Sequence, residues 1–278
     1  ALLISILLPS LSRARELAKR AVCSANLRGM GQGMHIYSND NEEWFPHSLY
    51  REPENASENE TSVTFVEQMA VDYTLRTTTT GGSPDYEEVH PSRSLFLLVI
   101  GGQCTPKQFV CPSSGESEDN AQAGINRFDF RGYQNVSYGY QLPFVNKGKP
   151  RNGMDPRMPL SADKGPYFQT GTTDAQGATH DAKRTGDLAP SFGLDESDVL
   201  TVPNERWRPY NSRNHNGEGQ EILFVDGHVE FSKKAAAGVN SDNIYTMMPG
   251  FELLDSIEGD TPDDEYGPWT QTDSVIVP

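Results

Sequence analysis

Imidazole and carboxylate side chains are concentrated near one predicted β-hairpin of this chain. His215 lies eleven positions before Asp226, and His228 follows the dipeptide Asp226-Gly227. Imidazoles close to a carboxylate can transfer protons or hold a metal ion. The simpler alternative is a structural role, in which hydrogen bonds of His215 organise the loop 211–219. The spacing favours the structural role.

The motifs that mark most catalytic and cofactor sites do not occur in the sequence. Zinc hydrolases use closely spaced histidines or an H-E-x-x-H helix, and neither is present. There is no G-x-S-x-G elbow and no Walker loop, and the glycines of segment 29–33 lie inside a helical pattern rather than after a strand. We therefore predict a protein that is not an enzyme, that has no certain cofactor, and whose metal ligands, if any, are unknown.

Calcium is the cofactor for which the sequence offers candidate ligands. Calcium takes about six to eight oxygen ligands from acidic loops. None of the acidic loops here has the spacing of an EF-hand, so solvated loops are the simpler interpretation. The oxygen-rich segments are 39–43, 195–198, 240–243 and 260–265.

Three cysteines are too few for a disulfide framework and form no C-x-x-C pair. Cys104 and Cys111 enclose a loop short enough to close into a disulfide. Cys23 lies in a predicted helix and reaches Cys111 only if that segment packs on the helix, so the spacing leaves both pairings open. Sequons mark candidate glycosylation sites in a secreted, glycosylating context. They lie at Asn55, Asn59 and Asn135.

The clearest β signal is the segment 221–231, in which two apolar runs flank an Asp-Gly dipeptide. This dipeptide favours a two-residue type I′ turn, which predicts the pairs Phe224/Val229 and Ile222/Phe231. Because cross-strand partners share a face, these four side chains are predicted to form the core side of the hairpin. Further strands are predicted at 108–110, 136–140 and 160–162, and a short helix at 93–101.

Residues 2–38 are predicted to form one long amphipathic helix, because apolar and small positions recur every three or four residues from Leu11. Pro9 and the glycines of segment 29–33 make it locally imperfect. At ~1.5 Å per residue the helix is about 55 Å long, longer than a small domain is wide, so part of it should project. The apolar and small positions are Leu11, Ala14, Leu17, Ala18, Ala21, Val22, Ala25, Met30, Met34 and Tyr37.

The chain has 278 residues and a formal net charge of −16, which is unevenly placed. Residues 1–28 carry five basic side chains and one acidic one, a net charge of +4, so the remainder carries −20. Such an acidic body repels phosphate backbones, and we predict no nucleic-acid partner. The 25 glycines and 19 prolines indicate a loop-rich head. The apolar start, 1–11, covers only about half of a bilayer span.

Two separated segments resemble the prepilin-type proteins that carry a His, nine residues and then Asp-Gly near the C-terminus, a family abundant in planctomycete-like bacteria. One is the apolar start that continues into a basic helix, and the other is the hairpin with its upstream histidine. The segments 109–113 and 160–164 match between them. On this resemblance the signature residues are Cys23, Asn26, Cys111, Asp163, His215, Asp226, Gly227 and His228.

The chain departs from that family in two ways. Ten residues rather than nine separate His215 from Asp226, which indicates a one-residue extension of the loop between them. Family members also begin with a basic leader, a peptidase cleavage site and an apolar start whose Glu aligns subunits. This chain is expected to begin midway through the apolar helix, so those features are assigned to none of its residues.

The resemblance implies the architecture of a type IV pilin or a type II secretion pseudopilin. The expected fold class is α+β, with a long N-terminal helix packed on an antiparallel β-sheet and with long loop insertions. An assembly and membrane helix, 1–40, is expected to precede a globular head, 41–278. The expected function is structural: self-association into a helical filament, after cleavage and methylation by prepilin peptidase and with the help of inner-membrane assembly machinery.

The same resemblance implies where the protein is found and which residues assemble it. It is expected in the bacterial inner membrane before assembly and in an extracellular or periplasmic filament afterwards. Two alternatives stay open: a minor pseudopilin or accessory protein of a type II secretion system, and a secreted binding or hydrolytic domain on a pilin-like anchor. The basic residues of the helix, Arg13, Arg15, Lys19 and Arg20, are predicted to face acidic loops of another subunit or of the same head. The predicted assembly residues are Leu2, Leu3, Ile4, Ile6, Leu7, Leu8 and Leu11, with Arg13 and Arg15.

Overall fold

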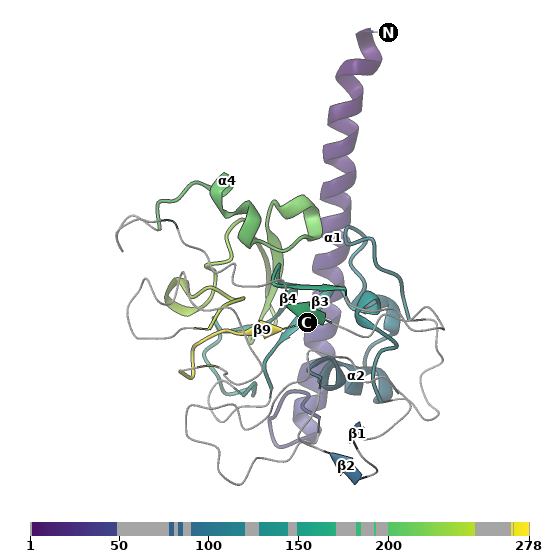
Figure 1. Ribbon diagram of the computed structural model, residues 1–278, viewed down its shortest axis with the longest axis vertical. Coiled ribbons are helices and arrows are strands. Elements are labelled where there is room, and N and C mark those ends of the chain that lie inside the picture. The colour runs from purple at the N-terminus through teal and green to yellow at the C-terminus, as the bar shows by residue number, and fades with distance from the viewer. Residues whose placement is uncertain are drawn as a thin grey trace.

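A computed structural model describes the chain in several ranges, drawn in colour in Figure 1. The side chains of residues 2–6, and those of four short strands, lie outside this description. So do the sequons at Asn55 and Asn59, and the acidic segments 195–198 and 260–265. The described ranges are 2–48, 78–80, 83–85, 90–119, 128–143, 149–170, 182–184, 192, 200–247, 268 and 270–277.

One helix, α1, spans Leu2–Asp40 and confirms the predicted long helix. Its 39 residues give a length of about 58 Å. Figure 1 shows that the N-terminal part extends well beyond the head, whereas the C-terminal part lies against it. Pro9 lies inside the helix without ending it. No helix among the described residues is both long enough and apolar enough to cross a bilayer.

The head is built on a five-stranded antiparallel sheet in the order β8-β7-β4-β3-β9. The predicted strands at 136–140 and 160–162 correspond to β3 and β4. A register shift between Pro159 and Ser161 interrupts the pairing of β4 with β7. The strands are β3 Tyr138–Gln141, β4 Pro159–Asp163, β7 Gln220–Phe224, β8 Val229–Ser232 and β9 Ile276–Val277.

The β7–β8 hairpin is present, but its predicted turn and register are wrong. Leu223 pairs with Val229, and Ile222 pairs with Glu230. The loop has three residues rather than two: the N–H of Gly227 donates to the carbonyl of Phe224 at 2.9 Å, and Gly227 has a φ of 85°. This is the three-residue hairpin with a glycine in the left-handed region. The register of β8 against β7 is therefore offset by one position from the prediction, and the four apolar side chains do not share a face.

Glycines in α1 allow the sheet and neighbouring loops to approach the helix closely. A Cβ atom at Gly31 would lie 2.8 Å from Cδ1 of Leu223, and one at Gly33 would lie 2.9 Å from Sγ of Cys104. These distances are shorter than a side chain tolerates, so the absence of a side chain is what permits the contact. Gly31 and Gly33, which are expected to weaken the helix locally, are therefore positions at which α1 packs against the head.

The short helix predicted at 93–101 is α2, Ser92–Ile100. The strand predicted at 108–110 is wrong, because Pro106–Phe109 forms the 3₁₀ turn η1. A capping box between Thr105 and Gln108 closes that turn. Phe109 then enters the core, where its ring lies 4.9 Å from that of Phe130.

The remaining elements are short. The pairs β1–β2 and β5–β6 each form a two-stranded antiparallel sheet. The whole is an α+β fold, a long N-terminal helix packed on an antiparallel sheet, as predicted. These elements are β1 Thr78–Thr80, β2 Ser83–Asp85, η2 Tyr133–Asn135, β5 Phe168–Thr170, β6 Ala182–Arg184, α4 Asn204–Trp207, η3 Arg208–Tyr210, η4 Asn214–Gly217 and η5 Val239–Ser241.

Candidate functional site

The apolar residues of α1 form two stripes on opposite sides of the helix, where the sequence predicted one. The head-facing stripe is fully buried and steps through Cys23, Leu27, Met30 and Met34. The other stripe faces away from the head, because a helix turns by about 100° per residue and nine residues separate Ala18 from Leu27. We call it the outward stripe. It consists of Leu7, Leu11, Ala14, Ala18, Val22, Ala25 and Ile36, all exposed.

The outward stripe is a surface that soluble helices normally make polar. Leu7, Leu11 and Val22 are 61%, 67% and 49% exposed, and Ile36, beside the head, is 53% exposed. An amphipathic helix on a globular domain carries charged residues on the side opposite the core. An apolar strip of this length marks an interaction surface. Of the predicted assembly residues, Leu7, Leu8 and Leu11 are exposed; Leu2, Leu3, Ile4 and Ile6 lie in the helix, with side chains outside the described set.

Four of the five lysine and arginine residues of α1 fall into two groups. Arg20 pairs with Glu218 of the same chain, and Lys19 lies 3.8 Å from Glu16 within the helix. Arg13 and Arg15 are exposed and make no ion pair with any residue that the structure describes. These two arginines are therefore available for contacts with another molecule.

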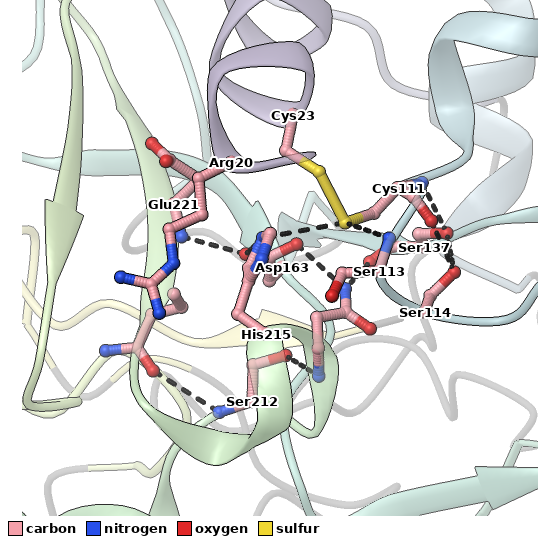
Figure 2. A network of polar contacts seen from close by, with 12 residues as sticks. Arg20, Cys23, Cys111, Ser113, Ser114, Ser137, Asp163, Ser212, His215 and Glu221 are labelled. Atoms are coloured by element: carbon pink, nitrogen blue, oxygen red, sulfur yellow. Dashed lines mark hydrogen bonds and ion pairs between the residues drawn. A yellow bond between two sulfur atoms is a disulfide. The ribbon is translucent and has the colours of Figure 1, made fainter. Parts of the chain in front are cut away.

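A second feature lies where α1 enters the head, and Figure 2 shows it. Cys23 of α1 forms a disulfide with Cys111, with the two Cα atoms 5.3 Å apart. The candidate pair of Cys104 with Cys111 is thus not the one formed, and Cys104 is a buried free thiol. Asn26, one turn further along the helix, donates to the carbonyl of Val110 at 3.1 Å. The signature residues of α1 therefore fasten the helix to the segment around Cys111.

His215, which is distant from α1 in the sequence, lies at the same junction. Its side chain is fully buried, and its Nδ1 lies 2.8 Å from Oε1 of Glu16 on α1. Its Nε2 lies 3.5 Å from Sγ of Cys111 and 3.4 Å from Oδ2 of Asp163. Figure 2 shows His215, Asp163 and the disulfide converging in this way. We call Glu16, Cys23, Cys111, Asp163 and His215 the junction cluster.

The backbone at His215 is strained to place the imidazole there. His215 has a φ of 54° and a ψ of 30°, and Asn216 has nearly the same values. This left-handed region costs a non-glycine residue about 1–3 kcal/mol, and such strain persists only where the surroundings fix it. The predicted structural role of His215 in its loop therefore extends to holding the head against α1.

The two carboxylates of the junction cluster differ in environment. Burial alone would raise the pKa of Glu16, but hydrogen bonds from His215 and Ser113 outweigh it and lower that pKa below its usual value. Glu16 is therefore an ionised acceptor, and Nδ1 of His215 is the donor. Burial raises the pKa of Asp163, although His215, the Asn214 amide and the backbone N–H of Glu221 act in the opposite direction.

The Asp-Gly-His part of the predicted site lies apart from His215. Asp226 and His228 are exposed and bonded to each other at the hairpin turn. A Cβ at Gly227 would lie 3.7 Å from Nε2 of His35, so the turn meets α1 near residue 35. His215 meets it at Glu16, about 29 Å away along the helix. The hypothesis that His215 meets Asp226 and His228 in one catalytic or metal site is therefore wrong. His215 lies before β7 and residues 226–228 lie after it, and the two ends of this segment contact α1 at different points.

Two further predictions can be placed. Asn135 is only 5% exposed, and its Nδ2 donates to the carbonyl of Ser117 at 3.0 Å, so it is not a glycosylation site in the folded chain. In the acidic segment 240–243, Asp242 is buried and accepts the N–H of Ser274 at 2.7 Å. Asp242 therefore forms a hydrogen bond in the protein interior and is not part of a solvated loop.

The head also has a pocket of about 320 Å³ beside Trp44. Nζ of Lys149 lies 4.8 Å from the centre of the Trp44 ring, and Arg151 and Asp155 also line the pocket. An aromatic ring with flanking charges can hold a polar ligand. Nothing in the sequence marked these residues, because Trp44 is distant in the chain from the others.

The chain matches no curated protein and no solved structure. A family model described as a protein of unknown function (DUF1559) matches residues 12–158, which is more than half of the chain. The matched segment contains most of α1 and includes Cys23, Asn26 and Cys111. It ends before Asp163 and His215, so the C-terminal half of the predicted signature lies outside the match. By this match, the chain belongs to the DUF1559 family.

Proposed function

We propose that the protein is a structural subunit of a filament of the type IV pilus or pseudopilus class. In this proposal α1 packs against α1 of neighbouring copies, and the head lies on the outside. The observation that carries the proposal is the outward stripe: one helix buries one apolar face in its own head and leaves a second apolar face exposed along its length. A second copy of the same helix is the occupant that offers matching chemistry.

The composition of the outward stripe suits helix–helix packing. Ala14, Ala18 and Ala25 alternate with larger apolar side chains, and small residues let helix backbones approach closely. Full burial of Leu7, Leu11, Val22 and Ile36 would contribute about 6–12 kcal/mol per subunit before the cost of association. Repeated contacts that do not close into a ring produce a helical filament.

Maturation and location follow from the same proposal. The subunit is processed by a prepilin peptidase, is held in the bacterial inner membrane before assembly, and is moved by assembly machinery into an extracellular or periplasmic filament. Exposed Arg13 and Arg15 would face acidic loops of neighbouring heads. Exposed ion pairs are worth only about 0–1 kcal/mol each, so they would set register rather than strength.

The proposal is tested by placing a charge in the outward stripe of the protein in its native cells. Leu11→Asp and Ala18→Asp should abolish filaments, as seen by electron microscopy of sheared surface material, because an aspartate would be buried between helices. Leu200→Asp is the matched control, since Leu200 is 45% exposed and lies in the head. All three purified proteins should unfold at the same urea concentration. Normal filaments from the two stripe variants would overturn the proposal.

The Trp44 pocket favours one alternative, a binding domain carried on a pilin-like anchor. Here the helix anchors the protein and the head binds a polar ligand. Abundance and substitution distinguish the two candidates. A major subunit makes up most of the filament mass, and Trp44→Ala then leaves the filaments intact. A binding domain on an anchor loses its ligand binding in Trp44→Ala. A minor pseudopilin would instead be a trace component on which filament initiation depends.

A further inference from the structure

The junction cluster contains four metal-ligating side chains that meet at one point. Sγ of Cys23, Sγ of Cys111, a carboxylate oxygen of Asp163 and a ring nitrogen of His215 all lie within 4.8 Å of one another. All four residues are completely buried. Within the described part of the chain, this is the group of His, Cys, Asp and Glu side chains arranged to hold a metal ion.

We propose that Cys23 and Cys111, when they are thiols, bind a zinc ion together with His215 and Asp163. The junction between α1 and the head is then closed by zinc in the reduced protein and by the disulfide in the oxidised protein. This inference goes beyond filament assembly, because it concerns how a single subunit is held together.

The two distances from the histidine match a tetrahedral zinc site, whereas the two sulfurs, bonded to each other in the disulfide, would separate to about 3.8 Å on the metal. With Zn–S bonds of about 2.3 Å and Zn–N and Zn–O bonds of about 2.0 Å, tetrahedral geometry separates sulfur from nitrogen by about 3.5 Å and nitrogen from oxygen by about 3.3 Å. The corresponding distances from Nε2 of His215 are 3.5 Å to Sγ of Cys111 and 3.4 Å to Oδ2 of Asp163.

The groups around the four donors orient them as a metal site requires. A zinc-bound histidine commonly donates its other ring N–H to a carboxylate, and Nδ1 of His215 donates to Glu16. This leaves the lone pair of Nε2 directed at the sulfurs and at Asp163. The carboxylate of Asp163 is fixed by the Asn214 amide and by the N–H of Glu221, each at 2.8 Å.

The donor set selects zinc over calcium. Calcium takes oxygen ligands only, whereas two thiolates, an imidazole and a carboxylate suit zinc. Four protein ligands with no exposed position make a closed, structural site rather than a catalytic one. The site therefore requires no enzymatic activity.

The thiol form, the zinc form and the disulfide form are linked by loss of two protons and then by a two-electron oxidation. The newly made chain carries Cys23 and Cys111 as thiols, and zinc binding releases two protons as both become thiolates. Oxidation by a protein disulfide removes two electrons from the two thiolates, forms the Cys23–Cys111 bond and frees the zinc. The oxidising disulfide takes up the two electrons together with two protons from water and becomes two thiols.

The test uses purified full-length protein reduced anaerobically with a phosphine, which becomes a phosphine oxide, and Co²⁺ as a spectroscopic probe. The reduced protein should bind one equivalent of Co²⁺, with the charge-transfer absorption of cobalt–thiolate bonds, and Zn²⁺ should displace it. Cys104→Ala is the matched control and should bind normally, since burial raises the pKa of Cys104 to about 11 and keeps it a thiol. Cys23→Ser and His215→Gln should lose the thiolate absorption or most of the affinity.

Glu16→Gln should weaken zinc affinity by about 10–100-fold, because it changes the group that orients His215 without removing a ligand. If the reduced protein is unfolded without metal, Zn²⁺ should restore its circular dichroism, and failure to do so contradicts the proposal. Absence of cobalt–thiolate absorption in a folded, reduced protein would overturn it. So would absorption that survives His215→Gln and disappears in Cys104→Ala. None of these outcomes bears on filament formation.

Discussion

Nδ1 of His215 lies 2.8 Å from Oε1 of Glu16, across 199 positions of sequence. Glu16 is the most N-terminal described residue of α1 whose side chain still packs against the head. Beyond Glu16 toward the N-terminus, every described side chain of α1 is exposed. The pair therefore lies at the boundary between the packed and the projecting parts of the helix.

Removing Glu16 should destabilise the fold although the side chain is near the surface. In Glu16→Ala, the N–H of His215 stays buried without an acceptor, which costs about 1–3 kcal/mol. Urea denaturation measures this loss as a lower midpoint. Glu230→Ala is the control, because Glu230 is exposed, and it should change stability by less than about 0.5 kcal/mol. Equal stability of the two variants would show that the contact contributes nothing.

Loss of the disulfide should strongly destabilise the fold. Cys23 and Cys111 are 88 positions apart, and a loop of that length corresponds to about 4–5 kcal/mol of stabilisation on the chain-entropy model. Cys23→Ser should lower the free energy of unfolding by roughly that amount in metal-free buffer. Cys104→Ala should lower it by only about 1 kcal/mol. A thiol titration that finds three free cysteines in the native, oxidised protein would contradict the pairing.

Gly29 and Gly31, two residues apart in α1, should respond differently to alanine. Gly31→Ala gains about 1 kcal/mol of helix propensity but pushes a Cβ to 2.8 Å from Cδ1 of Leu223 in a packed core, so it should be destabilising overall by about 1–2 kcal/mol. At Gly29 the nearest atom is in the amide of Gln108, whose Oε1 accepts the N–H of Thr105 in the capping box. Gly29→Ala gains the same helix propensity and loses about as much when that amide is displaced from the cap, so it should stay within about 0.5 kcal/mol of the natural protein in urea denaturation.

The sequence predicts the elements that local pattern determines. The 3.6-residue periodicity gives α1, and the Asp-Gly dipeptide gives the hairpin, because both signals lie within a few residues of the structure they form. The hairpin register was mispredicted because an Asp-Gly pair fits both the two-residue turn and the three-residue loop that places Gly227 in the left-handed region. One extra loop residue places Leu223 and Glu221 of β7, rather than Ile222 and Phe224, on the same face as Val229 and Phe231.

The junction cluster could not be predicted from spacing. Its zinc donors come from α1, from the segment after η1, from the end of β4 and from η4, so no short motif contains two of them. The resemblance named Cys23, Cys111, Asp163 and His215 as signature residues, but not as neighbours. The outward stripe was missed for a different reason: the helix carries apolar residues on two faces, and a periodicity count merges them.

Glu221 should make the stability of the fold depend on pH. Burial and the nearby Asp163 raise the pKa of Glu221 to about 7, although Arg20 and Arg28 act in the opposite direction. A carboxyl group whose pKa is higher in the folded than in the unfolded state binds protons more tightly when folded, so it destabilises the fold as the pH rises from about 4.5 to above 7. The loss reaches about 3 kcal/mol at most, at 1.36 kcal/mol per pH unit. Glu221→Gln removes this titration and should be more stable than the natural protein at pH 8, with a difference that shrinks toward pH 4. Urea denaturation of both proteins at several pH values measures the difference directly, and a constant difference across that range would mean that folding does not raise the pKa of Glu221.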